Sequence, residues 1–192
     1  MDRLDPRTTA LVLIDLQGGI LRFARGPYNG DQVLATAAGL ARRFRAAGAL
    51  VVLVRVGFSD GLPELLRQPT DEPAPIDDTL PLPEGWWDQP AQLEVAPTDI
   101  QITKRNWGAF HGTELDLQLR RRGITTVVLG GIATNFGVES TARAGWELGY
   151  AMVLAEDAMS APAAEMHEFA VGRIFPRLGL VRKTAEVLGA LA

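Results

Sequence analysis

The sequence contains no cysteine, and this absence excludes several kinds of chemistry at once. Disulfides, thiolate metal sites and cysteine nucleophiles all need a thiol, so none of them operates in this chain. Histidine is nearly absent too, because His111 and His167 are the only two in 192 residues. A zinc site built on histidine would need both of them, together with carboxylates at ligand distance. We therefore expect no catalytic metal and no cofactor.

Long apolar runs and an excess of positive charge are also missing. The longest apolar run, 49–54, is far shorter than the roughly 20 residues that cross a membrane. Residues 1–6 lack the apolar stretch of a secretion signal, so we expect a cytoplasmic protein without a membrane partner. The formal net charge is −4, and the 19 lysines and arginines are scattered along the chain. Nucleic-acid binding normally needs a basic face, so we expect no nucleic-acid partner.

The composition that remains is that of an ordinary globular protein, with 47 % hydrophobic and 22 % charged residues. A length of 192 residues fits a single domain, 1–192, with a full-sized core. Four short runs rich in β-branched residues are apolar on both faces, which is typical of strands buried inside a parallel sheet. These runs are 10–14, 49–54, 125–129 and 151–154.

Helical patterns separate most of these runs, and a glycine directly follows three of the helices, as is common at helix C-termini. In the second helix we expect Thr113 as the N-cap and Leu117 among the apolar contacts. The alternation predicts a doubly wound α/β fold, with a six-stranded, mostly parallel sheet and helices on both faces. Helices are predicted at 33–47, 113–122, 135–148, 163–174 and 184–191, and two weaker edge strands at 100–103 and 179–181.

The segment 57–99 departs from this alternation because it holds eight of the twelve prolines, which remove backbone donors and break helices. A loop of this length in a compact domain is either a lid or a disordered segment. Trp86 and Trp87 indicate that part of it packs, since a pair of exposed tryptophans is costly. The loop is long and apolar enough to need a partner surface, so we expect a homodimer or a dimer-based oligomer.

Three candidates for chemistry follow predicted strands. Asp15 comes directly after the first strand, Lys104 after the weaker strand 100–103, and residues 130–137 join the strand 125–129 to its helix. Ligands of open parallel sheets bind outside the carboxyl ends of the strands. An acid and an amine in one cleft would stabilise each other's charges or share a proton as an acid/base pair. The alternatives are a turn or helix cap for Asp15 and an ordinary surface position for Lys104.

Residues 13–17, 104–115 and 131–143 resemble three successive blocks of the isochorismatase-like hydrolases, a family of the cysteine-hydrolase superfamily. The resemblance spans nearly the whole chain and implies a Rossmann-type α/β sandwich. It also implies that Asp15 is the acid/base residue and that Lys104 is its partner. The nucleophilic cysteine of the family would then correspond to Gly137.

The resemblance further implies a cis peptide between Ile132 and Ala133, which would turn the N–H groups of Ala133 and Gly137 toward a substrate oxygen. A glycine cannot form the thioester of the cysteine amidases. A hydroxyl of Thr134 or Ser140 is an alternative nucleophile. Thr134 also fits an N-cap, however, and Ser140 fits a buried helix contact.

Two reaction types remain open under this resemblance. Isochorismatases proper also have glycine at the nucleophile position, and they hydrolyse a vinyl ether by protonating the alkene carbon, after which water adds. The pair Asn135–Phe136, however, is more similar to the amidase branch. We therefore expect a small-molecule hydrolase that uses Asp15, Lys104 and water on a vinyl-ether or amide substrate.

A second class of function is an inactive pseudoenzyme that binds a small ligand on the same fold. The retained Asp15 and Lys104 favour the hydrolase, because a dead site has no physical reason to keep a costly buried pair of charges. A nucleotide-binding module fits less well, since residues 15–20 lack the glycine pattern that cradles a pyrophosphate.

The remaining candidates concern substrate binding. Metal-binding amidases of the family have an Asp-x-His run after the second strand, whereas residues 55–60 here contain no histidine, so the resemblance also implies no metal. Arg55 would hold a substrate carboxylate or, alternatively, form a salt bridge within the loop. Gln17 and Asn135 are further substrate-binding candidates.

Aromatic side chains and the two histidines complete the candidates. Phe23, Trp107 and Phe110 would wall a small apolar pocket or, alternatively, belong to the core. We expect His111, beside this pocket, to be a structural hydrogen-bonding residue. We expect His167, in the helix 163–174, to be solvated.

Overall fold

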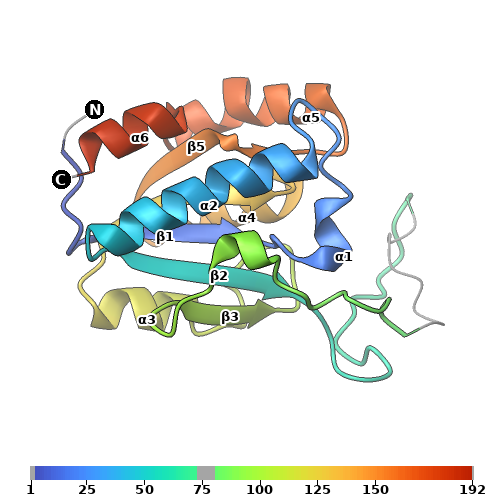
Figure 1. The fold of residues 1–192 in the computed structure, drawn as a ribbon. Coiled ribbons are helices and arrows are strands. Elements are labelled where there is room, and N and C mark those ends of the chain that lie inside the picture. The colour runs from blue at the N-terminus through green and yellow to red at the C-terminus, as the bar shows by residue number, and fades with distance from the viewer. Residues whose placement is uncertain (1–2, 73–80, 192) are drawn as a thin grey trace.

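The computed structural model describes residues 3–72 and 81–191, and its strands form one six-stranded sheet (Figure 1). Every neighbouring pair of strands is parallel, and the order is β3-β2-β1-β4-β5-β6. The predicted doubly wound α/β fold is therefore confirmed, and so is the placement of the two weaker strands at the edges. The strands are β1 (Thr9–Ile14), β2 (Leu50–Val56), β3 (Ile100–Lys104), β4 (Thr126–Ile132), β5 (Ala151–Ser160) and β6 (Gly179–Arg182).

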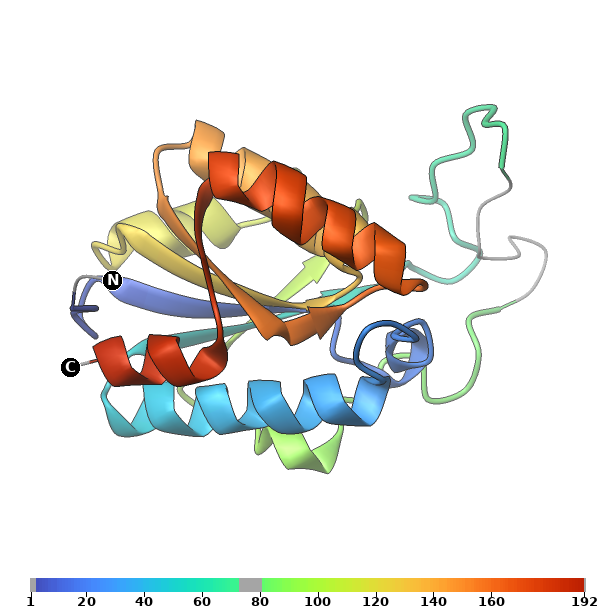
Figure 2. The same ribbon diagram turned by 90° about the horizontal axis from the view of Figure 1, so that it is seen from above.

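Helices cover both faces of this sheet. Figure 2 shows α2 and α6 side by side on one face, while α3, α4 and α5 lie on the other. None of the helices within the described ranges is long and apolar enough to span a bilayer. The helices are α1 (Gly18–Leu21), α2 (Gly30–Ala46), α3 (Leu115–Arg121), α4 (Glu139–Glu147), α5 (Ala164–Phe169) and α6 (Thr184–Ala190). Short 3-10 or π turns are η1 (Ala91–Leu93), η2 (Thr134–Val138), η3 (Ala170–Ile174) and η4 (Phe175–Arg177).

The central strand β1 shows why its sequence is apolar on both faces. All six of its residues are buried. Leu11 and Leu13 pack in the layer under α2, whereas Val12 and Ile14 pack in the layer under α3 and α4. A strand covered on both faces needs an apolar side chain at every position, which is the pattern that predicted it.

Several element boundaries differ from the predicted ones. The strands β4 and β5 continue to Ile132 and Ser160, well beyond the predicted ends at 129 and 154. Their pairing is irregular after Leu129, which lets β5 include charged residues. The helix α2 begins at Gly30 rather than at 33.

Side-chain capping explains the early start of α2. The Asn29 side chain accepts a hydrogen bond from the Gln32 N–H, and the Gln32 side chain accepts one from the Asn29 N–H, each at 2.9 Å. In α3 the N-cap is Glu114 rather than the predicted Thr113, although the Thr113 hydroxyl accepts a hydrogen bond from the first residue of α3. Leu117 is 46 % exposed, so its predicted apolar contact was wrong.

The described parts of the loop, 57–72 and 81–99, contain no strand and only the short turn η1; positions 73–80 of the predicted loop lie outside the described residues. The ion pair between Arg45 and Asp99, at 2.7 Å, fastens the end of the loop to α2. Trp86 is buried, as expected, and its indole covers the backbone of Gly19. Because its own chain covers Trp86, this residue gives no reason for a partner surface. The predicted dimer therefore has to be tested separately.

Candidate functional site

The candidate site lies at the carboxyl edge of the sheet, where the order of the strands reverses. The chain fills one half of the sheet with β1, β2 and β3, and then crosses over to β4 on the other side of β1. Crevices at such reversal points are the usual ligand sites of open α/β sheets. Asp15 directly follows β1, Lys104 ends β3, and η2 follows β4 at this edge.

The predicted pairing of Asp15 and Lys104 is confirmed. The Lys104 Nζ lies 2.8 Å from the Asp15 Oδ2, and the two residues are only 2 % and 4 % exposed. The ammonium also donates to the backbone oxygen of Asn106, at 3.0 Å. Asp15 has a left-handed backbone, with φ at +53°, and its N–H donates to the Val54 oxygen. Lys104 is therefore not at the ordinary surface position of its alternative interpretation, and the N-cap of α1 is Gln17 rather than Asp15.

The electrostatic environment leaves Asp15 able to exchange a proton. Burial raises the pKa of Asp15 from 3.8 to about 6, although the neighbouring Lys104 ammonium acts in the opposite direction. The second carboxyl oxygen, Oδ1, is buried and has no hydrogen-bond partner among the described residues. A carboxyl group with one free oxygen and a pKa near neutrality is suited to general acid/base chemistry.

Gly137 faces this carboxylate from η2. A Cβ atom added at Gly137 would lie 3.4 Å from the Asp15 Oδ2 and 3.0 Å from the Ile14 Cγ2. The Thr141 hydroxyl donates to the Gly137 oxygen at 2.6 Å and accepts the Ala109 N–H at 3.0 Å, which joins α4 to the segment after β3. The expected cis peptide between Ile132 and Ala133 is also present, directly before η2.

Two predicted binding residues have buried polar atoms with no partner among the described residues: the Arg55 Nε and the Asn135 Oδ1. The Arg55 guanidinium lies 5.5 Å from the Trp87 ring centroid, and no ion pair of Arg55 is found within the described ranges. Sequence reasoning missed Arg105, whose Nη1 is buried and unpartnered in the same way while its Nε contacts Glu64 at 3.4 Å. Its place directly after Lys104 was the only available signal.

Gln17 is buried but points into the protein rather than toward a ligand. Its amide nitrogen donates to the Val56 and Trp86 oxygens, at 3.0 and 2.8 Å, and its oxygen accepts the Val56 N–H at 2.8 Å. Both donors are therefore occupied by backbone. The geometry makes Gln17 a brace between β2 and the loop at Trp86, which differs from the predicted contact with substrate.

Replacing Gln17 by methionine should destabilise the fold strongly. The change keeps a similar volume but leaves the Val56 N–H without the acceptor that Gln17 supplies, at a cost of about 1–3 kcal/mol for the unsatisfied group. The Val56 and Trp86 oxygens each lose one hydrogen bond but still accept one, from the Trp86 indole and from the Gly19 N–H. Urea unfolding of both proteins measures the difference. The matched control is Gln101→Met on β3, where the side chain is exposed and little change is expected. Equal losses in the two variants would contradict the bracing role.

The three aromatic residues that were predicted to wall one pocket lie in three different places in the structure. Trp107 is 64 % exposed and meets the Phe136 ring edge-on at 4.8 Å, and its backbone oxygen lies beside Gly137. Phe110 stacks on Tyr150 at 5.7 Å inside the core, so it does not wall a pocket. Phe23 is half-buried and packs against the core layer of α2. Only Trp107 adjoins the candidate site.

Both histidines differ from expectation. His111 is exposed, and the hydrogen bond found there uses its backbone oxygen rather than its ring. His167 is only 2 % exposed, so its predicted solvated position was wrong. The Thr134 hydroxyl contacts the His167 Nδ1 at 2.9 Å, whereas the N-cap of η2 is Ala133. Ser140 is half-buried rather than buried.

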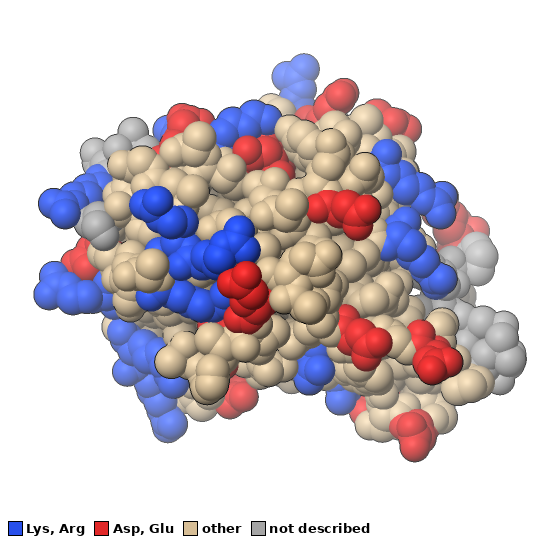
Figure 3. Space-filling model, in the orientation of Figure 1, with Lys and Arg blue, Asp and Glu red and all other residues tan. Residues whose placement is uncertain are grey.

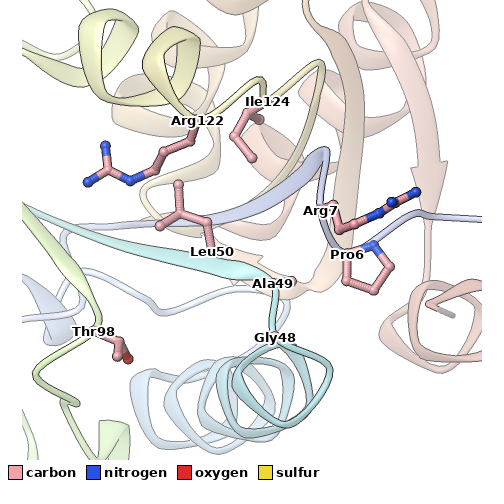
Figure 4. Close-up of a pocket in the computed structure, with 8 residues that line it drawn as sticks. All are labelled: Pro6, Arg7, Gly48, Ala49, Leu50, Thr98, Arg122 and Ile124. Atoms are coloured by element: carbon pink, nitrogen blue, oxygen red, sulfur yellow. The ribbon is translucent and has the colours of Figure 1, made fainter.

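A surface hollow elsewhere does not coincide with this site. Figure 4 shows its lining residues, which lie at or just before the starts of β1, β2, β3 and β4, at the amino edge of the sheet. Figure 3 shows basic side chains gathered toward the left, where α2 and α3 end. Arginines in the last turn of a helix interact favourably with its dipole, so this gathering has a structural cause.

The described residues contain no group of three histidines or carboxylates placed to hold a metal ion.

Comparison with known proteins gives concordant matches over the whole chain. Residues 9–186 match the family model described as the isochorismatase domain. The chain is 56 % identical over 191 residues, 100 % of both chains, to YecD of Escherichia coli O157:H7, an uncharacterized isochorismatase family protein. It is 33 % identical over 207 residues, 97 % of this chain and 87 % of the other, to the ureidoacrylate amidohydrolase RutB of Caulobacter segnis. A solved isochorismatase family protein from Burkholderia thailandensis has a TM-score of 0.91 at 44 % identity, over 100 % of this chain and 98 % of that chain.

Proposed function

Since this chain belongs to the isochorismatase family, a family of hydrolases, we propose that it hydrolyses a small organic molecule with Asp15, Lys104 and a water molecule. The observation that carries the proposal is the buried ion pair, in which one carboxyl oxygen of Asp15 has no partner within residues 3–72 and 81–191. Gly137 takes the place of the family's nucleophile. Because a glycine has no side chain, a substrate atom or a water molecule can approach the Asp15 carboxyl there.

Hydrolysis of a vinyl ether needs only what this site holds. The protonated Asp15 donates its proton to the alkene carbon, and the ether carbon becomes an oxocarbenium ion. Water adds to that carbon and returns a proton to Asp15, after which the hemiketal breaks down into a carbonyl compound and an alcohol. The Lys104 ammonium steadies the negative charge that remains on Asp15 after the proton has left.

Substrate binding is assigned to groups around this pair. The unpartnered Arg55 Nε is suited to a substrate carboxylate, and the Asn135 Oδ1 is suited to a hydrogen-bond donor. The N–H groups of Ala133 and Gly137 would hold a substrate oxygen. A thermal-shift screen of small carboxylates and amides tests binding before any substrate is known, because a ligand that binds the folded state raises Tm.

Amide hydrolysis is the second candidate, favoured by the likeness to RutB, a ureidoacrylate amidohydrolase by name. In this case the ionised Asp15 removes a proton from the attacking water. A pseudoenzyme that only binds a ligand is the third possibility. The buried ion pair speaks against it, because desolvating two charges costs stability that a binding site alone does not require.

The pH profile should separate the two reactions. Burial raises the pKa of Asp15 to about 6 in the free protein. Vinyl-ether hydrolysis needs the protonated acid, so kcat/KM should fall about tenfold per pH unit above the pKa of Asp15. Amide hydrolysis needs the carboxylate, so kcat/KM should rise through the same range. A profile that is flat between pH 5 and 8 would remove Asp15 from both mechanisms.

We also propose that the chain forms a homodimer or a dimer-based oligomer. The long loop 57–99 and the exposed side chains of Trp107 and Phe169 are the features that favour a partner copy. Sedimentation velocity at micromolar concentration is expected to give at least twice the chain mass of 20.7 kDa. A single species at the mass of one chain would contradict the proposal.

A further inference from the structure

A second cluster of polar side chains, partly buried, begins at Thr134 in η2 and takes no part in the proposed reaction. The His167 ring on α5 is at its centre: its Nδ1 lies 2.9 Å from the Thr134 hydroxyl, and its Nε2 lies 3.2 Å from a Glu156 carboxyl oxygen. Lys183 pairs with Glu156 and also donates to the Tyr28 hydroxyl, at 2.9 Å. The cluster therefore connects η2, β5 and α5 with the segments before α2 and α6.

The connectivity of Thr134, His167 and Glu156 is that of a nucleophile, a base and an orienting carboxylate. The direction of the hydroxyl argues against that use. It points to the buried His167 ring on α5, whereas Gly137 of the same turn faces Asp15. The three residues are thus arranged to hold the turn rather than to attack a substrate.

The proton positions in this chain of bonds follow from the charges. Burial alone would raise the pKa of Glu156, but hydrogen bonds from Lys183 and His167 lower it overall, so Glu156 is ionised. Burial lowers the pKa of His167, which keeps its ring neutral near neutral pH. The ionised Glu156 then holds the ring proton on Nε2, and Nδ1 is left to accept the Thr134 O–H.

The position of Thr134 explains why this bond matters for the site. Thr134 is the first residue of η2, a turn with no side-chain N-cap, and Asn135 and Gly137 belong to the same turn. Thr141 holds the other end of the turn through the Gly137 oxygen. The turn is therefore fastened at both ends, with the surface that covers Asp15 between the two attachments.

We infer that His167 is a positioning residue, which fixes η2 against Asp15 by accepting the hydrogen bond of Thr134. The inference rests on the proposed function because it concerns the same site, the carboxyl group of Asp15. If η2 loses this attachment, more water reaches the Asp15 carboxyl and the burial that disfavours its charge is reduced. A measurement on Asp15 itself then reports on the position of the turn and needs no substrate.

The test is a carbon-13 NMR titration of the Asp15 carboxyl group in the full chain. In the unchanged protein, Asp15 should titrate at about 6. Thr134→Val removes the hydroxyl at nearly constant volume, and the pKa of Asp15 is expected to fall clearly below that of the unchanged chain, toward its ordinary value. Thr134→Ser keeps the hydroxyl and should restore the value of the unchanged chain. His167→Phe should act like Thr134→Val, and the valine variant alone suffices if the phenylalanine variant does not fold.

The matched control is Tyr150→Phe, which removes another hydroxyl hydrogen bond, the one to Asp116 at 2.8 Å, far from η2. This variant should leave the titration of Asp15 unchanged. The inference is overturned if Asp15 titrates alike in the unchanged chain and in folded Thr134→Val, or if Tyr150→Phe shifts it equally. An Asp15 that already titrates near its ordinary value in the unchanged chain overturns it too, as does covalent capture of Thr134 by a fluorophosphonate, which labels nucleophilic hydroxyls.

Discussion

Replacing Asp15 by asparagine is expected to lower kcat/KM by about 10²–10⁴-fold, the usual contribution of a positioned general acid or base. Asparagine keeps the shape of the side chain but cannot transfer a proton. Both candidate reactions depend on that transfer, so the loss is expected whichever substrate the chain accepts. The measurement compares kcat/KM on the first substrate that the ligand screen identifies. Asp116→Asn, on the outer face of α3, is the matched control and should retain full activity. An Asp15→Asn variant within threefold of the unchanged chain would contradict the proposed mechanism.

The stability of the Asp15→Asn variant must be known before its activity is interpreted. The folded chain holds the Asp15 proton more tightly than the unfolded chain, because burial raises the pKa from 3.8 to about 6. The resulting stabilisation is fully present below pH 3.8 and is lost as the pH rises through about 6. At pH 7 the charged Asp15 therefore contributes no stability by this route, and its removal alone should not unfold the chain.

The Asp15→Asn variant can still lose stability through Lys104, because the substitution leaves the buried Lys104 ammonium without a counter-charge. Breaking one side of a buried pair typically costs about 3–5 kcal/mol, whereas replacing both charges by apolar groups is often neutral. The double variant Asp15→Asn/Lys104→Met should therefore be more stable than Asp15→Asn. Inactivity of this stable double variant would separate loss of chemistry from loss of fold.

The sequence predicted the sheet well where a strand is apolar on both faces. β1 and β2 follow this rule, and their observed ends lie within two residues of the predicted ones. The ends of β4 and β5 were missed for different reasons. Gly130 and Gly131 resemble a loop, although both lie in β4; a side chain at Gly131 would collide with the Ile14 backbone, which explains the glycine at that position. The charged residues Glu156 and Asp157 interrupt the apolar pattern, although they lie in an irregular part of β5.

The candidate site was predictable to the extent that backbone order determines it. Asp15 and Lys104 were identified because each adjoins the end of a strand, and parallel strands bring such ends to one edge. The position of His167 could not be predicted in this way. Its partners Thr134 and Glu156 come from separate elements, and no local pattern links the three residues. Along α5 the apolar Met166 and Phe169 are exposed while the histidine is buried, which is the reverse of an amphipathic pattern.

A thiol introduced at Gly137 should report on the same site. In Gly137→Cys the Cβ would lie 3.4 Å from the Asp15 Oδ2, and the Ile14 methyl at 3.0 Å must give by a few tenths of an ångström. The nearest carboxyl oxygen is the one paired with Lys104, so the two charges largely offset each other at the sulfur. The start of the helical segment that runs through η2 and α4 then favours the thiolate.

We expect the Gly137→Cys thiol to react with iodoacetamide near pH 7 about tenfold faster than a model thiol, as a pKa lowered from about 8.5 to about 7 implies. The unchanged chain has no cysteine, so the label reports on this position alone. The matched control is Gly172→Cys in η3, where a side chain meets open space and ordinary reactivity is expected. Equal or slower reaction at Gly137→Cys in a folded protein would show that the negative charge of Asp15 keeps the proton on the sulfur or that the reagent does not reach the thiol.

A reactive thiol that hydrolyses simple amides would identify the chain as a cysteine amidase that lost one residue. A reactive thiol without amidase activity, beside an unchanged chain that cleaves a vinyl ether only while Asp15 is present, would identify the vinyl-ether reaction, because that chemistry needs the acid and has no use for the sulfur.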